Sequence, residues 1–186
     1  MALILLIVAN VGVFLLMASN YGSAGYRARE LVRAGGNLGY LSLHGEWWRL
    51  FTATYIHAGI GHLFGNMLLL WITGTYLERR LGSMRFFVAY TLTGLAASLT
   101  SAYVHPNVVS VGASGCIAGL LGVLVTLYAT GRGYGLSGSW LTQTIVINAV
   151  YSFVPSVDWV AHAGGFLAGL VLGVVLTSRP EEAQYY

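Results

Sequence analysis

Six apolar runs, each close to the length that crosses a lipid bilayer, fill most of this 186-residue chain. A membrane-spanning helix needs roughly 20 mostly apolar residues, and it satisfies its own backbone hydrogen bonds where no water is available. The runs cover approximately residues 2–18, 57–77, 86–104, 112–131, 140–154 and 157–177. They predict an all-α, polytopic membrane protein with a six-helix bundle over residues 1–177 and a short cytoplasmic tail at 178–186.

The charged residues are too few to solvate a globular surface. They make up 8% of the chain, whereas ordinary soluble domains contain about 25%. All nine basic residues are arginines and the net charge is +3, which in a membrane protein indicates topology rather than nucleic-acid binding. We therefore expect a lipid bilayer around the chain and no nucleic-acid partner. The membrane is expected to be the plasma (inner) membrane of a prokaryote.

Arginines are concentrated in alternate turns between the runs. The turn after the second run contains three, the turn after the fourth contains Arg132, and the tail contains Arg179. The turns at 105–110 and 155–156 contain none. Because arginine-rich short loops stay in the cytoplasm, both termini are predicted to be cytoplasmic. The long first loop, about residues 20–56, is then on the outer face, where its tryptophans indicate interfacial structure.

Four polar residues lie near the predicted outer ends of three different runs: His62 and Asn66, Ser114, and His162. Polar groups inside a span are costly and are functional candidates. Ser114 would need a base to become a nucleophile, and the imidazole of His162 is suited to that role. The negative charge that forms on a carbonyl oxygen needs fixed donors, which Asn66, His62 and the backbone N–H of Ser114 would supply. The site is expected to open to the outer face.

These residues also have structural interpretations. His62 and Asn66, which share a helix face, could instead form hydrogen bonds between helices. His57 at the membrane surface, and His44 and His105 in loops, are expected to be interfacial or solvated. Cys116 is expected to be a small packing residue.

Glycines recur at intervals of four in the sixth run, at Gly165, Gly169 and Gly173. Small residues let membrane helices approach closely. The matching surface is the fourth run, which contains Gly115, Gly119 and Gly122. Packing of these two helices would bring His162 up to Ser114.

The residues that other classes of membrane hydrolase require are absent from this sequence. No histidine is followed by glutamate, so the zinc-protease helix motif is absent. Asp158 is the single aspartate, so an aspartyl pair is excluded. We expect neither a metal nor a cofactor.

Five short motifs occur in one order along the chain. They are Trp48-Arg49, His62-x-x-x-Asn66, Glu78-x-Arg80-Leu81-Gly82, Gly112-Ala113-Ser114-Gly115 and Ala161-His162-x-x-Gly165-x-x-x-Gly169. From Trp48 to Gly173 the chain resembles the rhomboid intramembrane serine proteases, in their minimal six-helix form.

The resemblance implies a catalytic dyad of Ser114 and His162, with His62, Asn66 and the Ser114 backbone around the oxyanion. It implies an endopeptidase that cleaves transmembrane segments of other membrane proteins. Ala118 departs from the pattern, because some relatives have an aromatic residue there that stacks on the catalytic histidine.

Two other functions stay open. A catalytically inactive rhomboid-like protein would bind membrane-protein clients, although such proteins typically lack the dyad. A small transporter is disfavoured, because the polar residues cluster at one depth. The shortest run, 140–154, and the loop from Phe153 to Trp159 are expected to form a mobile gate for substrate.

Overall fold

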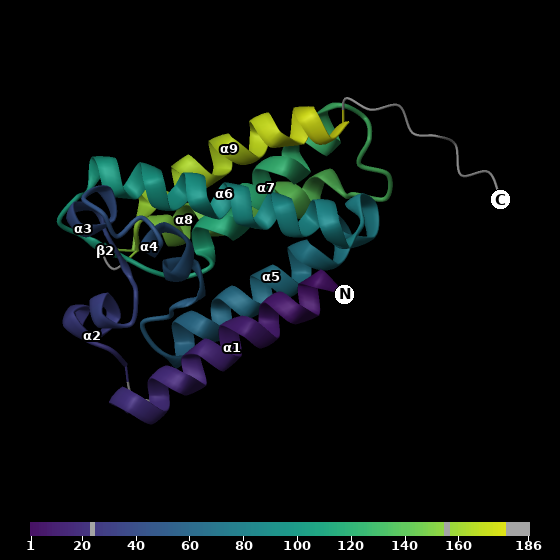
Figure 1. Ribbon diagram of the computed structural model, residues 1–186. Coiled ribbons are helices and arrows are strands. Elements are labelled where there is room, and N and C mark those ends of the chain that lie inside the picture. Colours follow the sequence, from purple (N-terminus) through teal and green to yellow (C-terminus); the bar gives the residue numbers. More distant parts are fainter. Residues whose placement is uncertain (23–24, 155–156, 178–186) are drawn as a thin grey trace.

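The computed structural model describes residues 1–22, 25–154 and 157–177, and these ranges are mostly helical (Figure 1). Within them, six helices have 15 to 22 residues, and each overlaps one predicted run. They are α1 (Ala2–Tyr21), α5 (Ile60–Leu81), α6 (Ser83–Val104), α7 (Ser114–Ala129), α8 (Gly138–Ser152) and α9 (Trp159–Thr177). The predicted all-α, multi-pass membrane fold is therefore confirmed.

The long helices differ in whether they can cross a bilayer by themselves. Among the described residues, α1, α6 and α9 are long and apolar enough to do so. Helix α5 passes the same test only together with the segment Arg49–Tyr55, from which it is bent by 92°. Helix α7 has 16 residues and α8 has 15. The six spans of one domain over residues 1–177 stay a prediction.

Helix α7 is enclosed by protein, which explains why it can be short. It packs against α9, α6 and α5, and most of its side chains are buried. Backbone that ends at membrane depth is tolerated where protein or a polar cavity surrounds it. The start of α7, at Ser114, can therefore lie below the ends of its neighbours.

The contact between α7 and α9 depends on glycine, as the spacing predicted. A methyl group at Gly165 would overlap the carbonyl oxygen of Gly115, and one at Gly169 would overlap that of Gly119. Further along the contact, a methyl group at Gly122 would overlap the carbonyl oxygen of Phe166 in α9. One at Gly173 would overlap the side chain of Thr126 in α7. At Gly165 and Gly169 the backbones of the two helices are therefore in direct contact.

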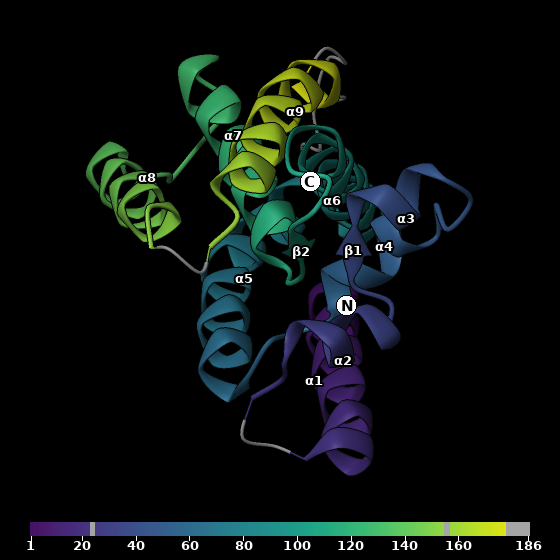
Figure 2. The ribbon, with the colours of Figure 1, turned by 90° about the vertical axis from the view of Figure 1, so that its left-hand side faces the viewer.

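The long first loop is folded into short elements at one end of the bundle (Figure 1). They are α2 (Ala28–Arg33), β1 (Asn37–Leu38), α3 (Gly39–Leu43), α4 (Arg49–Thr52) and the 3-10 helix η1 (Ala53–Tyr55). Strand β1 pairs antiparallel with β2 (Val109–Ser110), with Asn37 opposite Ser110. Figure 2 shows this ribbon close to the start of α7. The loop therefore packs beside the N-terminus of α7.

A buried arginine fixes the loop's shape. The guanidinium of Arg49 donates to the carboxylate of Glu46 and to the carbonyl oxygens of Val32 and Gly36. Arg49 is buried, and these three acceptors compensate for its lost hydration. The arginine of the Trp48-Arg49 motif is thus a structural residue of the loop.

Several predictions fall on residues that the structure does not describe. The tail 178–186, with Arg179, and the turn 155–156 lie outside the described residues. The gate assigned to the segment from Phe153 to Trp159 stays a prediction, because this turn is part of it. Phe153 itself is exposed.

The glycine contact predicts a specific loss of stability. Replacing Gly169 by alanine should destabilise the fold by about 1–3 kcal/mol, the usual effect of an added group in a close-packed contact, because the methyl group would overlap the Gly119 carbonyl oxygen. The measurement is the midpoint of thermal unfolding in detergent. Gly12→Ala in α1 is the matched control, since no atom lies within 4 Å of the added methyl. Equal midpoints for both variants would contradict the proposed contact.

Candidate active site

Ser114 is the first residue of α7, and the two residues before it are held by the first loop. The backbone N–H of Gly112 donates to the carbonyl oxygen of Ala53 at 2.9 Å. The N–H of Ala113 donates to Nε2 of His57 at 3.5 Å. Gly112 has φ +114°, a conformation that side chains strongly disfavour. These contacts fix the backbone from which α7 begins at Ser114, and Ser114 lines a cavity described below.

The prediction that His57 is interfacial or solvated was wrong. Its exposed fraction is 0%, and its ring lies 5.1 Å from the ring of His62. The reason is that α5 begins at Ile60, so His57 stands in the sharp turn after η1 rather than at the end of a helix. Its place within an apolar run was the available signal, because a polar group there needs a partner.

His44 and His105 lie at the surface, as predicted. His44 is exposed and stacks on Tyr40. His105 has an exposed fraction of 33% and lies 3.6 Å from a carboxylate oxygen of Asp158. Cys116 is fully buried in the core, as a packing residue should be.

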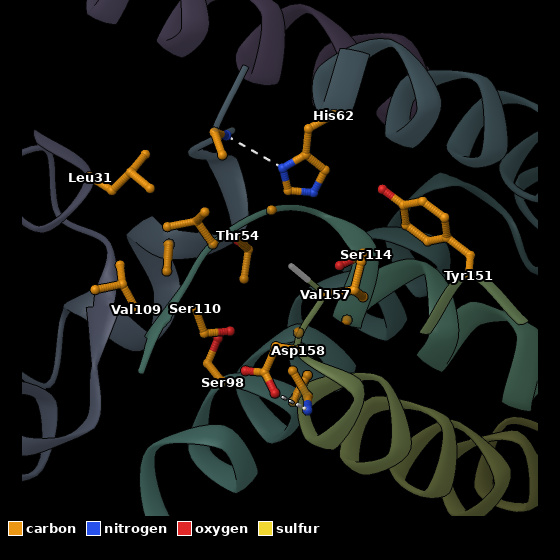
Figure 3. A pocket seen from close by; sticks show the side chains of 18 residues that line it. Leu31, Thr54, His62, Ser98, Val109, Ser110, Ser114, Tyr151, Val157 and Asp158 are labelled. Carbon is orange, nitrogen blue, oxygen red and sulfur yellow. Dashed lines mark hydrogen bonds between the residues drawn. The ribbon is translucent and has the colours of Figure 1, made fainter. Parts of the chain in front are cut away.

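His62 presents an N–H group toward the backbone before Ser114. Its Nδ1 accepts a hydrogen bond from the N–H of Ala58 at 3.4 Å (Figure 3). In the neutral ring the proton is therefore on Nε2. A methyl group built on Gly112 would lie 2.8 Å from that Nε2. The N–H of His62 thus points into the space that a glycine keeps open.

Asn66 brings a second donor to the same place. It is one turn after His62 in α5 and is buried. The methyl position on Gly112 is 3.3 Å from its Nδ2. Among the described residues, no acceptor is bonded to this Nδ2. Since buried polar groups are usually paired, an unpaired amide next to a candidate nucleophile indicates a binding role.

His162 is buried near the start of α9. Its Nδ1 lies 2.6 Å from Oγ of Ser152, and its Nε2 has no hydrogen-bond partner within the described ranges. The neighbouring residues Ala161 and Gly165 pack against Gly115, the residue after Ser114. The α7–α9 contact therefore brings the His162 segment close to the Ser114 segment, although no hydrogen bond joins the side chains of Ser114 and His162 among the described residues.

The candidate residues line two cavities. One, of about 230 Å³, is lined by Ser114, His62 and Gly112, together with Tyr151 and Asp158 (Figure 3). The other, of about 260 Å³, is lined by His162 and Ser152, by Ala118, and by Phe153 and Trp159. An aromatic ring is absent at position 118, and the second cavity occupies the space beside His162.

Asp158 has partners other than His162. Its carboxylate accepts from the hydroxyl of Ser101 at 2.5 Å and from the N–H of Ala161 at 3.2 Å, and it faces His105. It therefore holds the start of α9 to α6. Within the described part of the chain, no three His, Cys, Asp or Glu side chains are grouped so as to hold a metal ion.

Residues 44–179 match the rhomboid domain. The chain is 37% identical over 175 residues to the rhomboid protease GluP of Bacillus subtilis (strain 168), covering 92% of this chain and 34% of that protein. It is 41% identical over 143 residues to RHOMBOID-like protein 5 of Arabidopsis thaliana, covering 74% of this chain and 46% of the relative. A third similar protein is named inactive RHOMBOID-like protein 8, also from Arabidopsis thaliana, with 31% identity over 145 residues, 75% of this chain and 41% of the relative. The chain thus spans between about a third and a half of the length of these curated relatives.

The buried position of His57 predicts a local effect on the loop that leads into Ser114. His57→Ala removes the acceptor of the Ala113 N–H, and an unsatisfied buried donor costs about 1–3 kcal/mol. Amide hydrogen exchange across residues 112–114, followed by mass spectrometry, should become faster by the corresponding factor. His44→Ala removes an exposed imidazole and should leave this exchange unchanged. Unchanged exchange in His57→Ala would show that the loop does not depend on this bond.

Proposed function

The chain belongs to the rhomboid family, and we propose that it is an intramembrane serine endopeptidase with Ser114 as its nucleophile and His162 as its general base. The observation that carries the proposal is the buried amide nitrogen of Asn66, which has no hydrogen-bond partner among the described residues and lies beside the backbone that leads into Ser114. A donor without an acceptor is costly in a resting protein. It is useful if an acceptor, the oxyanion, forms there during the reaction.

The proposed reaction is acyl transfer to serine. The Nε2 of His162 takes the proton from the Ser114 hydroxyl as Oγ attacks the carbonyl carbon of the scissile peptide. The leaving amine then takes that proton, and water later releases the acyl group by the same route. Hydrogen bonds between catalytic groups are often long in the free enzyme and tighten in the substrate complex. The free Nε2 is consistent with this scheme.

The oxyanion would have three donors. The backbone N–H of Ser114 is at the first position of α7, where the helix dipole favours negative charge. The amide of Asn66 and the Nε2–H of His62 lie beside Gly112, two residues before Ser114. Because these donors are held in place before the charge forms, they need no reorganisation during the reaction.

The substrates proposed are transmembrane segments of other proteins, which would reach Ser114 from the bilayer. Water would enter the cavity of about 230 Å³ that Ser114 lines, from the outer face, with both termini in the cytoplasm as the arginines predict. The similar proteins come from a plant as well as a bacterium. The similar proteins therefore do not support the prokaryotic membrane expected from the sequence.

One alternative has an observation in its favour. The similar protein named inactive favours a chain that binds membrane-protein clients without cleaving them. The presence of both Ser114 and His162 here supports the protease instead. A cleavage assay separates the two functions.

Purified protein in detergent should cleave a helical membrane-protein substrate. Ser114→Ala and His162→Ala should each reduce cleavage to background, because each removes one half of the dyad, while the unfolding midpoint stays near that of the native chain. A serine-reactive phosphonate should label native protein and not Ser114→Ala. Cys116→Ala, two residues further along α7, is the control that should remain active. Cleavage by Ser114→Ala would rule out this nucleophile, and a native chain that binds but never cleaves would favour the client-binding alternative.

Asn66→Ala should lower kcat by roughly 100- to 1,000-fold, the effect of losing one oxyanion donor in a soluble serine protease. KM should change much less, because the amide would contact charge that is present only in the transition state. Steady-state kinetics on a membrane substrate measure both constants. Asn10→Ala removes a buried amide outside the cavity and should leave kcat near its native value. A raised KM with unchanged kcat would assign Asn66 to substrate binding instead.

A further inference from the structure

A serine hydroxyl contacts the ring of His162 on the side away from its free nitrogen. Oγ of Ser152 lies 2.6 Å from Nδ1 of His162. Ser152 is the last residue of α8, and both side chains are buried. The same Oγ lies 2.7 Å from the carbonyl oxygen of Asn148, one turn earlier in α8. The hydroxyl therefore stands between a backbone carbonyl and an imidazole.

The two short distances determine where the protons lie. A carbonyl oxygen only accepts hydrogen bonds, so two oxygens at 2.7 Å require the single hydroxyl proton of Ser152 to lie between them. Oγ then has lone pairs left but no proton for the imidazole. The proton in the contact with His162 must come from Nδ1. In the neutral ring, which carries one N–H, Nε2 is consequently bare.

We propose that Ser152 is a positioning residue that holds the ring of His162 in the Nδ1–H tautomer and so leaves Nε2 bare as a proton acceptor. The assignment of the tautomer stands on the hydrogen bonds alone, whereas its use in catalysis rests on the proposed protease function. A general base must offer a lone pair to the serine hydroxyl. With the other tautomer, Nε2 would carry a proton and could not accept one.

No other described side chain fills this role. Asp158, whose carboxylate would be the obvious partner for a catalytic histidine, is bonded to Ser101 and Ala161 instead. Position 118 carries an alanine, which offers neither a ring nor a polar atom to His162. The cavity of about 260 Å³ lies on that side of the ring. The hydroxyl of Ser152 is thus the polar contact that limits rotation of the imidazole.

The end of α8 adds a second contribution. Its last carbonyl groups carry partial negative charge, which favours a cation within the last turn. When His162 takes the proton of Ser114 it becomes an imidazolium, and both its N–H groups are then donors. Ser152 Oγ can keep accepting from Nδ1 throughout, so the contact need not be broken during the reaction.

The tautomer can be measured without any assay of activity. Full-length protein with ¹⁵N-labelled histidine, in detergent at a pH where His162 is neutral, gives separate NMR signals for protonated and bare ring nitrogens. The His162 signals are those lost in His162→Gln. The native chain should show a protonated Nδ1 and a bare Nε2. Ser152→Ala should lose this preference, and Ser152→Thr, which keeps the hydroxyl, should restore it.

Kinetics test the consequence for catalysis. Ser152→Ala should lower kcat by roughly 10- to 100-fold, the range found for outer partners of metal-bound histidines, with KM within about threefold of native. Ser152→Thr should recover most of kcat. Thr144→Val is the matched control, because Thr144 is a buried residue of α8 whose hydroxyl bonds only to the carbonyl oxygen of Trp140 among the described residues. It should change neither the NMR pattern nor kcat.

The positioning role of Ser152 and the protease function can fail separately. A bare Nδ1 in the native chain, or a tautomer that Ser152→Ala leaves unchanged, would overturn the positioning role whether or not the protein is a protease. An equal loss of kcat in Ser152→Ala and Thr144→Val would do the same, since it would reflect general damage to α8. If the native chain shows the Nδ1–H tautomer but neither cleaves nor reacts with the phosphonate, the tautomer assignment stands and the protease function fails.

Discussion

The direct contact between the backbones of α7 and α9 is the constraint on which the site depends. In a bilayer there is no hydrophobic force between helices, so close packing of small residues must hold them together. Gly165 and Gly169 lie on the carbonyl oxygens of Gly115 and Gly119, which sets both the separation and the register of the two helices. Register matters because Ser114 begins one helix and His162 is near the start of the other. A side chain at this contact would move the two apart.

The close packing also explains how the protein can keep unpaired polar groups. Nδ2 of Asn66 and Nε2 of His162 are buried without partners among the described residues, and such groups each cost about 1–3 kcal/mol. A loosely packed site would relax until each found an acceptor or a donor. Here α5 and α9 are held by contacts outside the site, so both groups remain free. This is the arrangement expected where partners form only during a reaction.

The two histidines at the site carry their protons on opposite nitrogens, and a hydrogen bond to each Nδ1 decides which nitrogen is protonated. The N–H of Ala58 donates to Nδ1 of His62, which leaves that ring an N–H at Nε2. The hydroxyl of Ser152 accepts from Nδ1 of His162, which leaves that ring a lone pair at Nε2. One imidazole is therefore a donor and the other an acceptor, as an oxyanion contact and a general base require. Neither role follows from the residue type, since neutral histidine can be either.

The sequence by itself determined the fold class and predicted four candidate site residues on three helices. Apolar runs must become helices in lipid because the backbone has no other partner there, and the glycine spacing on the fourth and sixth runs was enough to pair α7 with α9. The local pattern placed His57 in an apolar run but could not show that it lies under the loop before Ser114, because that position depends on the turn between η1 and α5 and on the hydrogen bond from Gly112 to the distant Ala53. It could not reveal Ser152 either, since a serine at a helix end most often bonds to its own backbone. A hydrogen bond extends over only about 3 Å. The hydroxyl of Ser152 therefore reaches His162 only after the tertiary fold has placed the end of α8 beside the start of α9.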